Sequence, residues 1–129
     1  MNVGMVIVTH GQAGQALIEV AEFILGQSLD QIRQVPFSQS AVHSTGEKEL
    51  RTALANSDEG NGVLVMTDLI GASPANHVTD LLQEFNAVMV SGLNLAMLLR
   101  AWNYRDQPLD VLAHKAVQGG KRGIEVVTP

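Results

Sequence analysis

Short apolar runs alternate with longer amphipathic stretches along this chain of 129 residues. Runs rich in valine and other apolar residues, without helical periodicity, predict strands that are buried on both faces of a sheet. Stretches whose apolar residues recur every three or four positions predict helices that pack by one side. The strands are expected at residues 2–9, 31–37, 63–67, 87–91 and 123–128. The helices are expected at residues 13–25, 44–54, 73–85, 93–102 and 108–118.

Start and stop signals delimit several of these helices. Ser44 and Glu47 have the spacing of a capping box, so the second helix is expected to begin at Ser44. Ser73 followed by Pro74 is typical of an N-cap and a first helical position. Two glycines at 119–120 are expected to end the last helix. The apolar side of the first helix is expected to consist of Leu17, Val20, Ala21, Ile24 and Leu25.

The order of the elements predicts the fold class. Strands that alternate with helices favour an α/β fold, in which a mainly parallel sheet is covered on both faces and each crossover is right-handed. We expect residues 1–129 to form one such domain. In these folds ligands bind beyond the carboxyl ends of the strands, so the polar residues at those ends are the candidates for a site. They lie at residues 9–11, 37–38, 68–73 and 92–94.

Composition excludes several classes of protein. Hydrophobic residues make up 46% of the chain and charged residues 16%, which is typical of a folded domain. The chain has no cysteine, so disulfides, thiolate metal sites and thiol catalysis are excluded. The net charge is −5 and no basic cluster exceeds a pair, which argues against a nucleic-acid partner. No apolar stretch approaches the roughly 20 residues of a membrane span, and no signal peptide is evident, so we expect a cytoplasmic protein that is not membrane-embedded.

His10 and Asp68 are the residues most indicative of chemistry, because each directly follows a buried strand. Taken singly, His10 is compatible with a surface histidine and Asp68 with a turn residue. If their strands are neighbours, the two side chains can meet above the sheet. A carboxylate that accepts from one ring nitrogen fixes the tautomer and leaves the other nitrogen with its lone pair as a nucleophile. With no serine or cysteine nucleophile beside it, the imidazole is itself the candidate nucleophile, and phosphorus is the electrophile that suits it.

The segment after Asp68 offers groups that can hold a phosphoryl group. Gly71, Ala72 and Ser73 lie at the expected start of a helix, which supplies free backbone N–H groups, a hydroxyl and the positive end of the helix dipole. Gly11 permits close approach of the backbone at the end of the first strand. Donors of this kind stabilise a phosphohistidine without a metal, and moderate stabilisation lets the group be passed on.

Three segments together resemble a known family. T-H-G after the first strand, D-x-x-G-x-S-P-x-N after the third and G-x-N after the fourth are similar to enzyme IIA of the mannose family of the phosphoenolpyruvate:sugar phosphotransferase system. The resemblance extends over essentially the whole chain in length and element order. It implies that His10 is the phosphorylated histidine, that Asp68 orients it and that Ser73 lies near the phosphoryl group.

The same resemblance implies a fold, partners and an activity. The fold is a flavodoxin-like, three-layer arrangement with strand order 2-1-3-4, and the chain forms a homodimer in which the C-terminal strand is exchanged. The activity is that of a phosphotransferase component with a phosphohistidine intermediate, which accepts the group from HPr and passes it to an enzyme IIB in sugar uptake. No cofactor is implied. The alternative is a free-standing regulatory IIA of an incomplete system, which signals through the phosphorylation state of His10.

The sequence departs from the family pattern at the rim of the site. Leu69 and Ile70 stand where the family often has an aromatic residue, Ala72 replaces a frequent glycine, and Ala96 stands where a proline is common. None of these positions carries the expected chemistry, but they shape the surface that meets partners, which leaves the regulatory alternative open. Candidates for supporting roles at the same edge are Thr9, Asn76, Asn94 and His43.

Other functions fit the sequence less well. Histidine phosphatases have arginine before the histidine, where this chain has Thr9, and the chain lacks an evident arginine clamp. A flavin-binding module would need an aromatic sandwich, but the only tryptophan and tyrosine, Trp102 and Tyr104, lie late in an apolar helix. His77 and His114 are expected on helices, facing solvent or the core edge. No metal site is expected, because His10 and Asp68 provide only two ligands.

Overall fold

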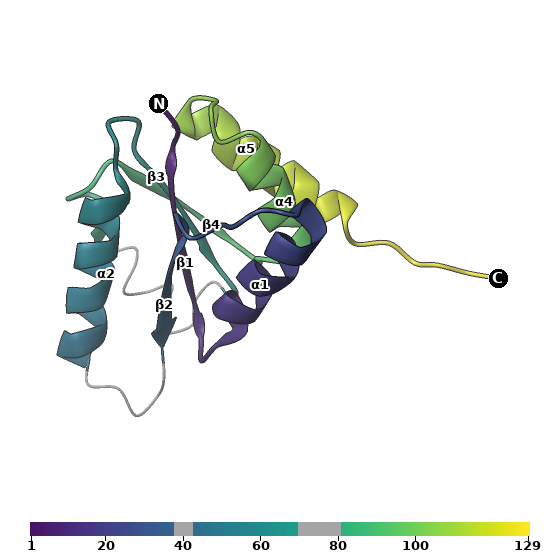
Figure 1. Cartoon of the computed structure of the whole chain (residues 1–129), viewed down its shortest axis with the longest axis horizontal. Coiled ribbons are helices and arrows are strands. Elements are labelled where there is room, and N and C mark those ends of the chain that lie inside the picture. The colour runs from purple at the N-terminus through teal and green to yellow at the C-terminus, as the bar shows by residue number, and fades with distance from the viewer. Residues whose placement is uncertain (38–42, 70–80) are drawn as a thin grey trace.

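A four-stranded parallel sheet forms the centre of the molecule in the computed structural model, which describes residues 1–37, 43–69 and 81–129. The strands are β1 (Gly4–His10), β2 (Arg33–Phe37), β3 (Val63–Thr67) and β4 (Ala87–Ser91). Their order in the sheet is β2-β1-β3-β4 (Figure 1). The four strands agree with the predicted positions to within two residues at each end, and the order is the one that the family resemblance implies.

β1 and β3 lie side by side at the centre of the sheet. Their apolar residues are buried on both faces because helices cover both sides, which explains why these segments read as continuous apolar runs. In the parallel register Val8 pairs with Thr67. Thr9 and His10 follow Val8 in the first of these strands, and Asp68 follows Thr67 in the other. These residues therefore lie at the same edge of the sheet.

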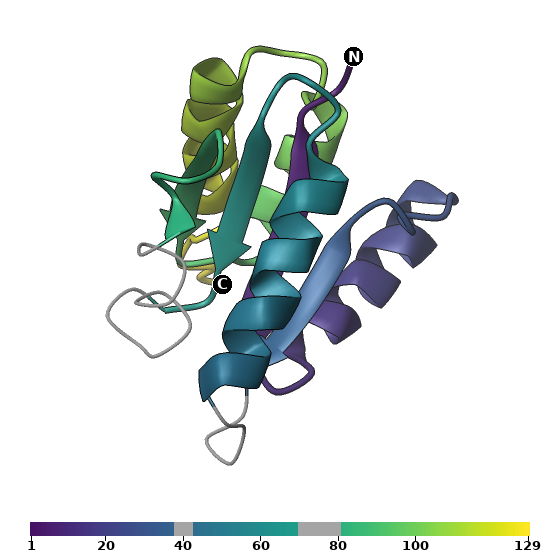
Figure 2. The ribbon, with the colours of Figure 1, turned by 90° about the vertical axis from the view of Figure 1, so that its left-hand side faces the viewer.

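Helices cover the sheet on both sides and give three layers. α2 (His43–Ser57) lies on one face, and α1 (Ala13–Leu25), α4 (Leu95–Asn103) and α5 (Leu109–Arg122) lie on the other (Figures 1 and 2). Each face has its own apolar core, with Leu50 and Leu54 of α2 in one and Leu98 of α4 in the other. The predicted α/β fold class is confirmed. Within the described ranges, no helix combines the length and apolarity that crossing a membrane requires.

The buried side of α1 agrees with the prediction at Leu17, Ala21 and Leu25, which lie in the core or pack against it, and differs from it at Val20 and Ile24. The helix has the expected bounds, but Val20 and Ile24 are 45% and 53% exposed, while Gly14, Ile18 and Ala21 are buried. The reason is the close approach of Gly14 to the sheet. A Cβ atom at Gly14 would lie 2.7 Å from Cγ2 of Ile7, so α1 packs against β1 with the side on which Gly14 lies.

The last helix continues past the glycines that were expected to end it. α5 runs to Arg122, and both Gly119 and Gly120 are buried within it. A Cβ atom at Gly119 would lie 2.5 Å from Cβ of Arg100 on α4. The prediction was wrong because these glycines serve the close packing of two helices rather than a helix end.

The C-terminal segment extends away from the domain after α5 (Figure 1). Residues 124–129 pair with no strand of the described sheet, so the expected fifth strand does not form within a single chain. Three of its apolar side chains, those of Ile124, Val126 and Val127, are between 75% and 90% exposed. Exchange of this segment between two copies stays a prediction.

Candidate functional site

His10 and Asp68 meet at the carboxyl edge of the sheet. His10 is the last residue of β1, and Asp68 follows directly after β3, the neighbouring strand. Nδ1 of the His10 ring lies 3.0 Å from Oδ2 of Asp68, and the backbone N–H of His10 donates to the same oxygen at 3.1 Å. The His10 side chain is 44% exposed and the Asp68 side chain 26%. The imidazole is thus anchored on one side and open to solvent on the other.

The surroundings of Asp68 favour its ionised form. Partial burial acts to raise the pKa of Asp68, but the amide and ring of His10 and the amide of Leu69 lower it by a larger sum, so the pKa lies below its ordinary value. The Leu69 N–H donates to the other carboxylate oxygen at 3.0 Å. An ionised carboxylate only accepts hydrogen bonds, so in the neutral ring of His10 the proton is on Nδ1 and the lone pair on Nε2.

Thr9 holds the start of α1 behind the histidine. Its side chain is fully buried, and its hydroxyl oxygen accepts a hydrogen bond from the backbone N–H of Gly14 at 2.8 Å. That N–H is one of the first-turn groups that have no partner inside the helix. Thr9 therefore fixes the helix N-terminus next to the site and has no exposed surface for a ligand.

Gly11 and Asn94 take different positions at this edge. Gly11 follows His10 with a φ of +52°, a left-handed conformation that turns the chain from β1 toward α1. Asn94 is the N-cap of α4, where its side-chain oxygen accepts from the Met97 N–H and its amide donates to the carbonyl of Gly120. The side chain of Asn94 is thus engaged in joining α4 to α5.

The remaining predicted site residues are only partly covered by the structure. His43 is the first residue of α2. Gly71, Ala72, Ser73 and Asn76 lie outside the described residues, as does His77. His114 is exposed on α5, as expected, and its Nδ1 lies 2.8 Å from the carbonyl of Asp110 one turn earlier.

Two backbone groups and one side chain contribute to the site without having been predicted. The N–H groups of His10 and Leu69 both donate to Asp68, and Nε2 of Gln34 donates to the Gly11 carbonyl at 3.4 Å. The sequence does not indicate which backbone N–H groups donate to a side chain. Gln34 lies on the neighbouring strand β2, and only the strand order could have brought it into consideration.

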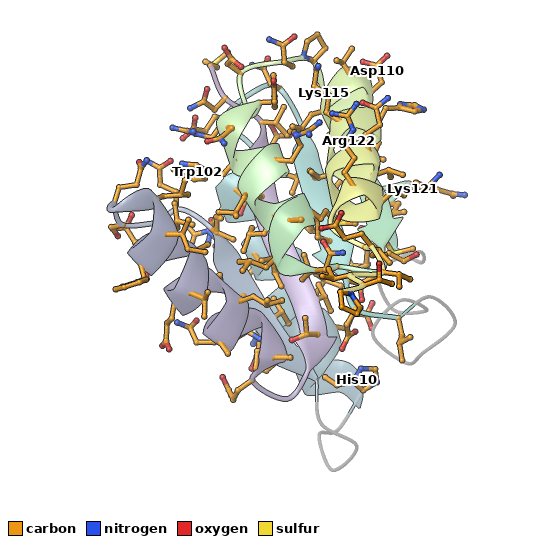
Figure 3. All side chains as sticks on the ribbon, turned by 90° about the vertical axis from the view of Figure 1, so that its right-hand side faces the viewer. His10, Trp102, Asp110, Lys115, Lys121 and Arg122 are labelled. Atoms are coloured by element: carbon orange, nitrogen blue, oxygen red, sulfur yellow. The ribbon has the colours of Figure 1, made fainter. Side chains whose placement is uncertain are left out.

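The fold and the site together define an α/β domain with an accessible histidine, held by an aspartate, at the carboxyl edge of a parallel sheet (Figure 3). Comparison with protein families makes this more specific. The model of the EIIA-man family, described as "PTS system fructose IIA component", matches residues 4–115. The chain belongs to this family.

Similar proteins agree with that membership. The chain is 28% identical over 130 residues to the PTS system mannose-specific EIIAB component of Escherichia coli K12, which covers 98% of this chain and 40% of that protein. The chain therefore spans about two fifths of the length of that relative. It is 29% identical over 105 residues to the PTS system fructose-specific EIIA component of Bacillus subtilis, which covers 81% of this chain and 71% of the relative.

A solved structure has the same fold. The mannose/sorbose-specific IIA subunit of the phosphotransferase system from Enterococcus faecalis superposes with a TM-score of 0.89 over 100% of this chain and 97% of its own. Its sequence identity to this chain is 24%, so the likeness concerns the fold alone.

Proposed function

We propose that this chain is a phosphocarrier of the phosphotransferase system, which accepts a phosphoryl group on His10 from the phosphohistidine of HPr and passes it to an enzyme IIB. The observation that carries the proposal is the contact between Nδ1 of His10 and Asp68, which leaves the opposite ring nitrogen, Nε2, with its lone pair. Family membership and relatives named as IIA and IIAB components support the same system.

The transfer step follows from this geometry. The Nε2 lone pair of His10 attacks phosphorus in line with the bond to the donor nitrogen. The new N–P bond forms as the donor N–P bond breaks, and the electron pair of the broken bond returns to the donor imidazole. The ring proton stays on Nδ1, where the Asp68 carboxylate stabilises the charge of the phosphorylated ring. Transfer to the acceptor repeats these events in reverse.

The phosphoryl oxygens need donors around His10. Gly71, Ala72 and Ser73 follow Asp68 closely in the sequence. We propose that they lie near His10, and that their backbone N–H groups and the Ser73 hydroxyl bind the oxygens together with the backbone at Gly11. Asn76 and His43 remain proposed supporting residues. The exposure of His10 suits a donor and an acceptor that are themselves proteins, since each must reach the ring.

The surroundings of the site bear on its partners. We propose a cytoplasmic homodimer that exchanges the C-terminal strand, since residues 124–129 expose three large apolar side chains. The net charge of −5 suits partners with a basic docking surface, and it influences the rate of encounter more than the affinity.

A regulatory role is the second candidate, and the exposed rim favours it. Leu69, next to Asp68, is 61% exposed at a position where the family often has an aromatic residue. This change at the rim leaves the regulatory role open. Both roles use the same phosphorylation of His10, and the discharge of the phosphorylated protein by an enzyme IIB distinguishes them.

Phosphorylation from phosphoenolpyruvate tests the proposal. Incubation with labelled phosphoenolpyruvate, enzyme I and HPr is expected to give acid-labile, base-stable label on the chain, and His10→Ala is expected to abolish it. His114→Ala is the matched control, because His114 is also exposed but lies on α5. That variant is expected to retain the label. Label that persists in His10→Ala would overturn the proposal.

A further inference from the structure

Half of the basic residues of this chain lie on two adjacent helices, α4 and α5. We call them the basic face, which consists of Arg100, Lys115, Lys121 and Arg122. The two helices have one acidic residue, Asp110 in the first turn of α5. The rest of the chain has four basic and twelve acidic residues. The charge is therefore divided unevenly, with a cationic surface on a protein that is otherwise strongly anionic.

The cations of the two helices lie close to one another around the ring of Tyr104. Cζ of Arg100 lies 5.8 Å from the centroid of this ring, and Nζ of Lys115 lies 4.4 Å from it. The helices approach closely at Gly119, where a Cβ atom would lie 2.5 Å from Cβ of Arg100. Lys115, Gly119 and Arg122 follow one another at spacings of four and three residues, so they share one side of α5. Cations from both helices therefore gather on one surface.

In the described part of the chain, no residue of the basic face takes part in an ion pair. The ion pairs found there join His10 to Asp68 and Arg51 to Glu47 and Glu84. A charge without a partner at a surface is favourably hydrated, but several like charges held side by side repel one another. An anionic group placed over the basic face would relieve this repulsion.

The helix dipoles account for only part of the basic face. Arg100 lies in the last turn of α4, and Lys121 and Arg122 lie in the last turn of α5, where cations offset the negative end of the dipole. Lys115 lies near the middle of α5, where the dipole has little effect. The position of Lys115 beside Arg100 thus calls for another explanation.

We propose that the basic face binds an acidic α-helix of a partner protein. Lys115 and Arg122 are seven residues apart, which is about 10 Å along α5. Carboxylates two turns apart on a partner helix have the same spacing, so one acidic helix that lies along α5 meets both cations and passes Arg100. Figure 3 shows His10 at the opposite end of the molecule from Lys115. A partner on the basic face therefore leaves the His10 ring accessible, and this docking surface is separate from the one used for phosphoryl transfer.

The distribution of charge favours a protein segment over an anionic membrane. A bilayer is a wide anionic surface, which would also repel the acidic residues that surround the basic face. Electrostatic interactions extend over about 8 Å at physiological ionic strength. A single helix is about 10 Å wide and meets little beyond the basic face itself.

Titration of the full chain with an acidic peptide tests the proposal. The probe is a synthetic alanine-rich helix with four glutamates at spacings of three, four and seven residues, and its control has glutamine at the same four positions. Amide chemical shifts in two-dimensional NMR spectra are expected to change saturably in α4 and α5 with the glutamate peptide, with a dissociation constant on the order of 1 mM at low salt, as is usual for a few exposed ion pairs. An increase in salt to about 0.2 M is expected to weaken binding several-fold.

A matched pair of double variants locates the binding. Lys115→Gln with Arg122→Gln removes two charges from the basic face and is expected to weaken binding about fivefold. Arg33→Gln with Lys48→Gln removes the same charge from exposed positions on β2 and α2, and its affinity is expected to stay within about twofold of the wild type. Arg122→Gln alone, at the end of α5, keeps the test decisive if the first variant fails to fold, and it is expected to weaken binding about twofold.

The other outcomes each count against the proposal. It would be overturned by an absence of saturable shifts, by equal effects of the two double variants, or by a glutamine peptide that binds as well as the glutamate peptide. Vesicles of phosphatidylglycerol that bind the chain while the peptide does not would assign the basic face to a membrane instead. None of these measurements involves phosphoryl transfer, so the result is independent of the function proposed for His10.

Discussion

Oδ2 of Asp68 accepts two hydrogen bonds from His10, one from the backbone amide at 3.1 Å and one from ring Nδ1 at 3.0 Å. A single oxygen therefore fixes both the end of β1 and the rotation of the imidazole. The two residues lie 58 positions apart in the sequence, and the parallel pairing of β1 with β3 brings them together. The orientation of His10 thus depends on the sheet as well as on its own rotamer.

Asp68→Asn is expected to slow the phosphorylation of His10 by roughly 10- to 100-fold without abolishing it, by analogy with the carboxylates that orient metal-binding histidines. Asp68 accepts from three N–H groups, and the asparagine amide replaces one accepting oxygen with a further donor. The measurement is the initial rate of labelling from phosphorylated HPr. Equal rates for the wild type and the variant would mean that Asp68 has a structural role only.

Acid is expected to remove the stability that Asp68 contributes. The pKa of Asp68 is lowered in the folded protein from its ordinary value of 3.8, so the unfolded chain binds the proton at a higher pH than the folded one. The contribution is therefore complete above about pH 5 and is lost as the pH falls through the folded pKa. Urea unfolding of the wild type and Asp68→Asn should show a difference in free energy of unfolding that shrinks below pH 4. A difference that does not vary with pH would contradict this assignment.

The strands and the central pair of residues were predictable because their signals are local and unambiguous. Strands buried on both faces read as apolar runs, and β3 and β4 have the predicted bounds. His10 and Asp68 stood out because each ends such a run. Which strands are neighbours is a property of the whole sheet, and for this the family resemblance supplied the order.

The errors concern positions where one residue type serves two purposes. Glycine both ends helices and permits close helix packing, and at Gly119 and Gly120 the second use applies. Likewise α1 carries apolar residues around much of its circumference, so its buried side depended on where the helix approaches the sheet. Oγ of Ser57 and Nε of Arg105, which are buried without a partner among the described residues, were not foreseeable, because burial of a single atom depends on packing between distant segments.

Thr9→Val is expected to lower the free energy of unfolding by about 1–3 kcal/mol although the two side chains have the same shape. The valine leaves the Gly14 N–H, which donates to the Thr9 hydroxyl at 2.8 Å, buried without a partner. Thr9→Ser keeps the hydroxyl and is the control. Its free energy of unfolding is expected to fall by less than that of Thr9→Val. The measurement is urea unfolding, and wild-type stability in the valine variant would show that this hydrogen bond contributes nothing.

Gly119→Ala is expected to destabilise the protein by about 1–3 kcal/mol, because its Cβ atom would lie 2.5 Å from Cβ of Arg100. The sign is diagnostic, since glycine to alanine in an unhindered helix stabilises by roughly 0.5–1 kcal/mol. Gln118→Ala, at an exposed position of the same helix, is the control and is expected to stay within about 0.5 kcal/mol of the wild type. The measurement is the free energy of unfolding from thermal or urea unfolding. A Gly119→Ala variant that is more stable than the wild type would show that α4 and α5 separate easily.

Dimerisation is expected to depend on the C-terminal segment. β4 is at the edge of the described sheet, and residues 124–129 are extended and expose Ile124, Val126 and Val127. Burial of these side chains against a second copy would remove their apolar surface from water. Sedimentation at micromolar concentration should therefore give about twice the chain mass of 13.8 kDa, and deletion of residues 123–129 should give monomer or aggregate. Val126→Asp should weaken the dimer, whereas Glu125→Gln, next to it, should not. A full-length chain that sediments as a monomer at that concentration would rule out strand exchange.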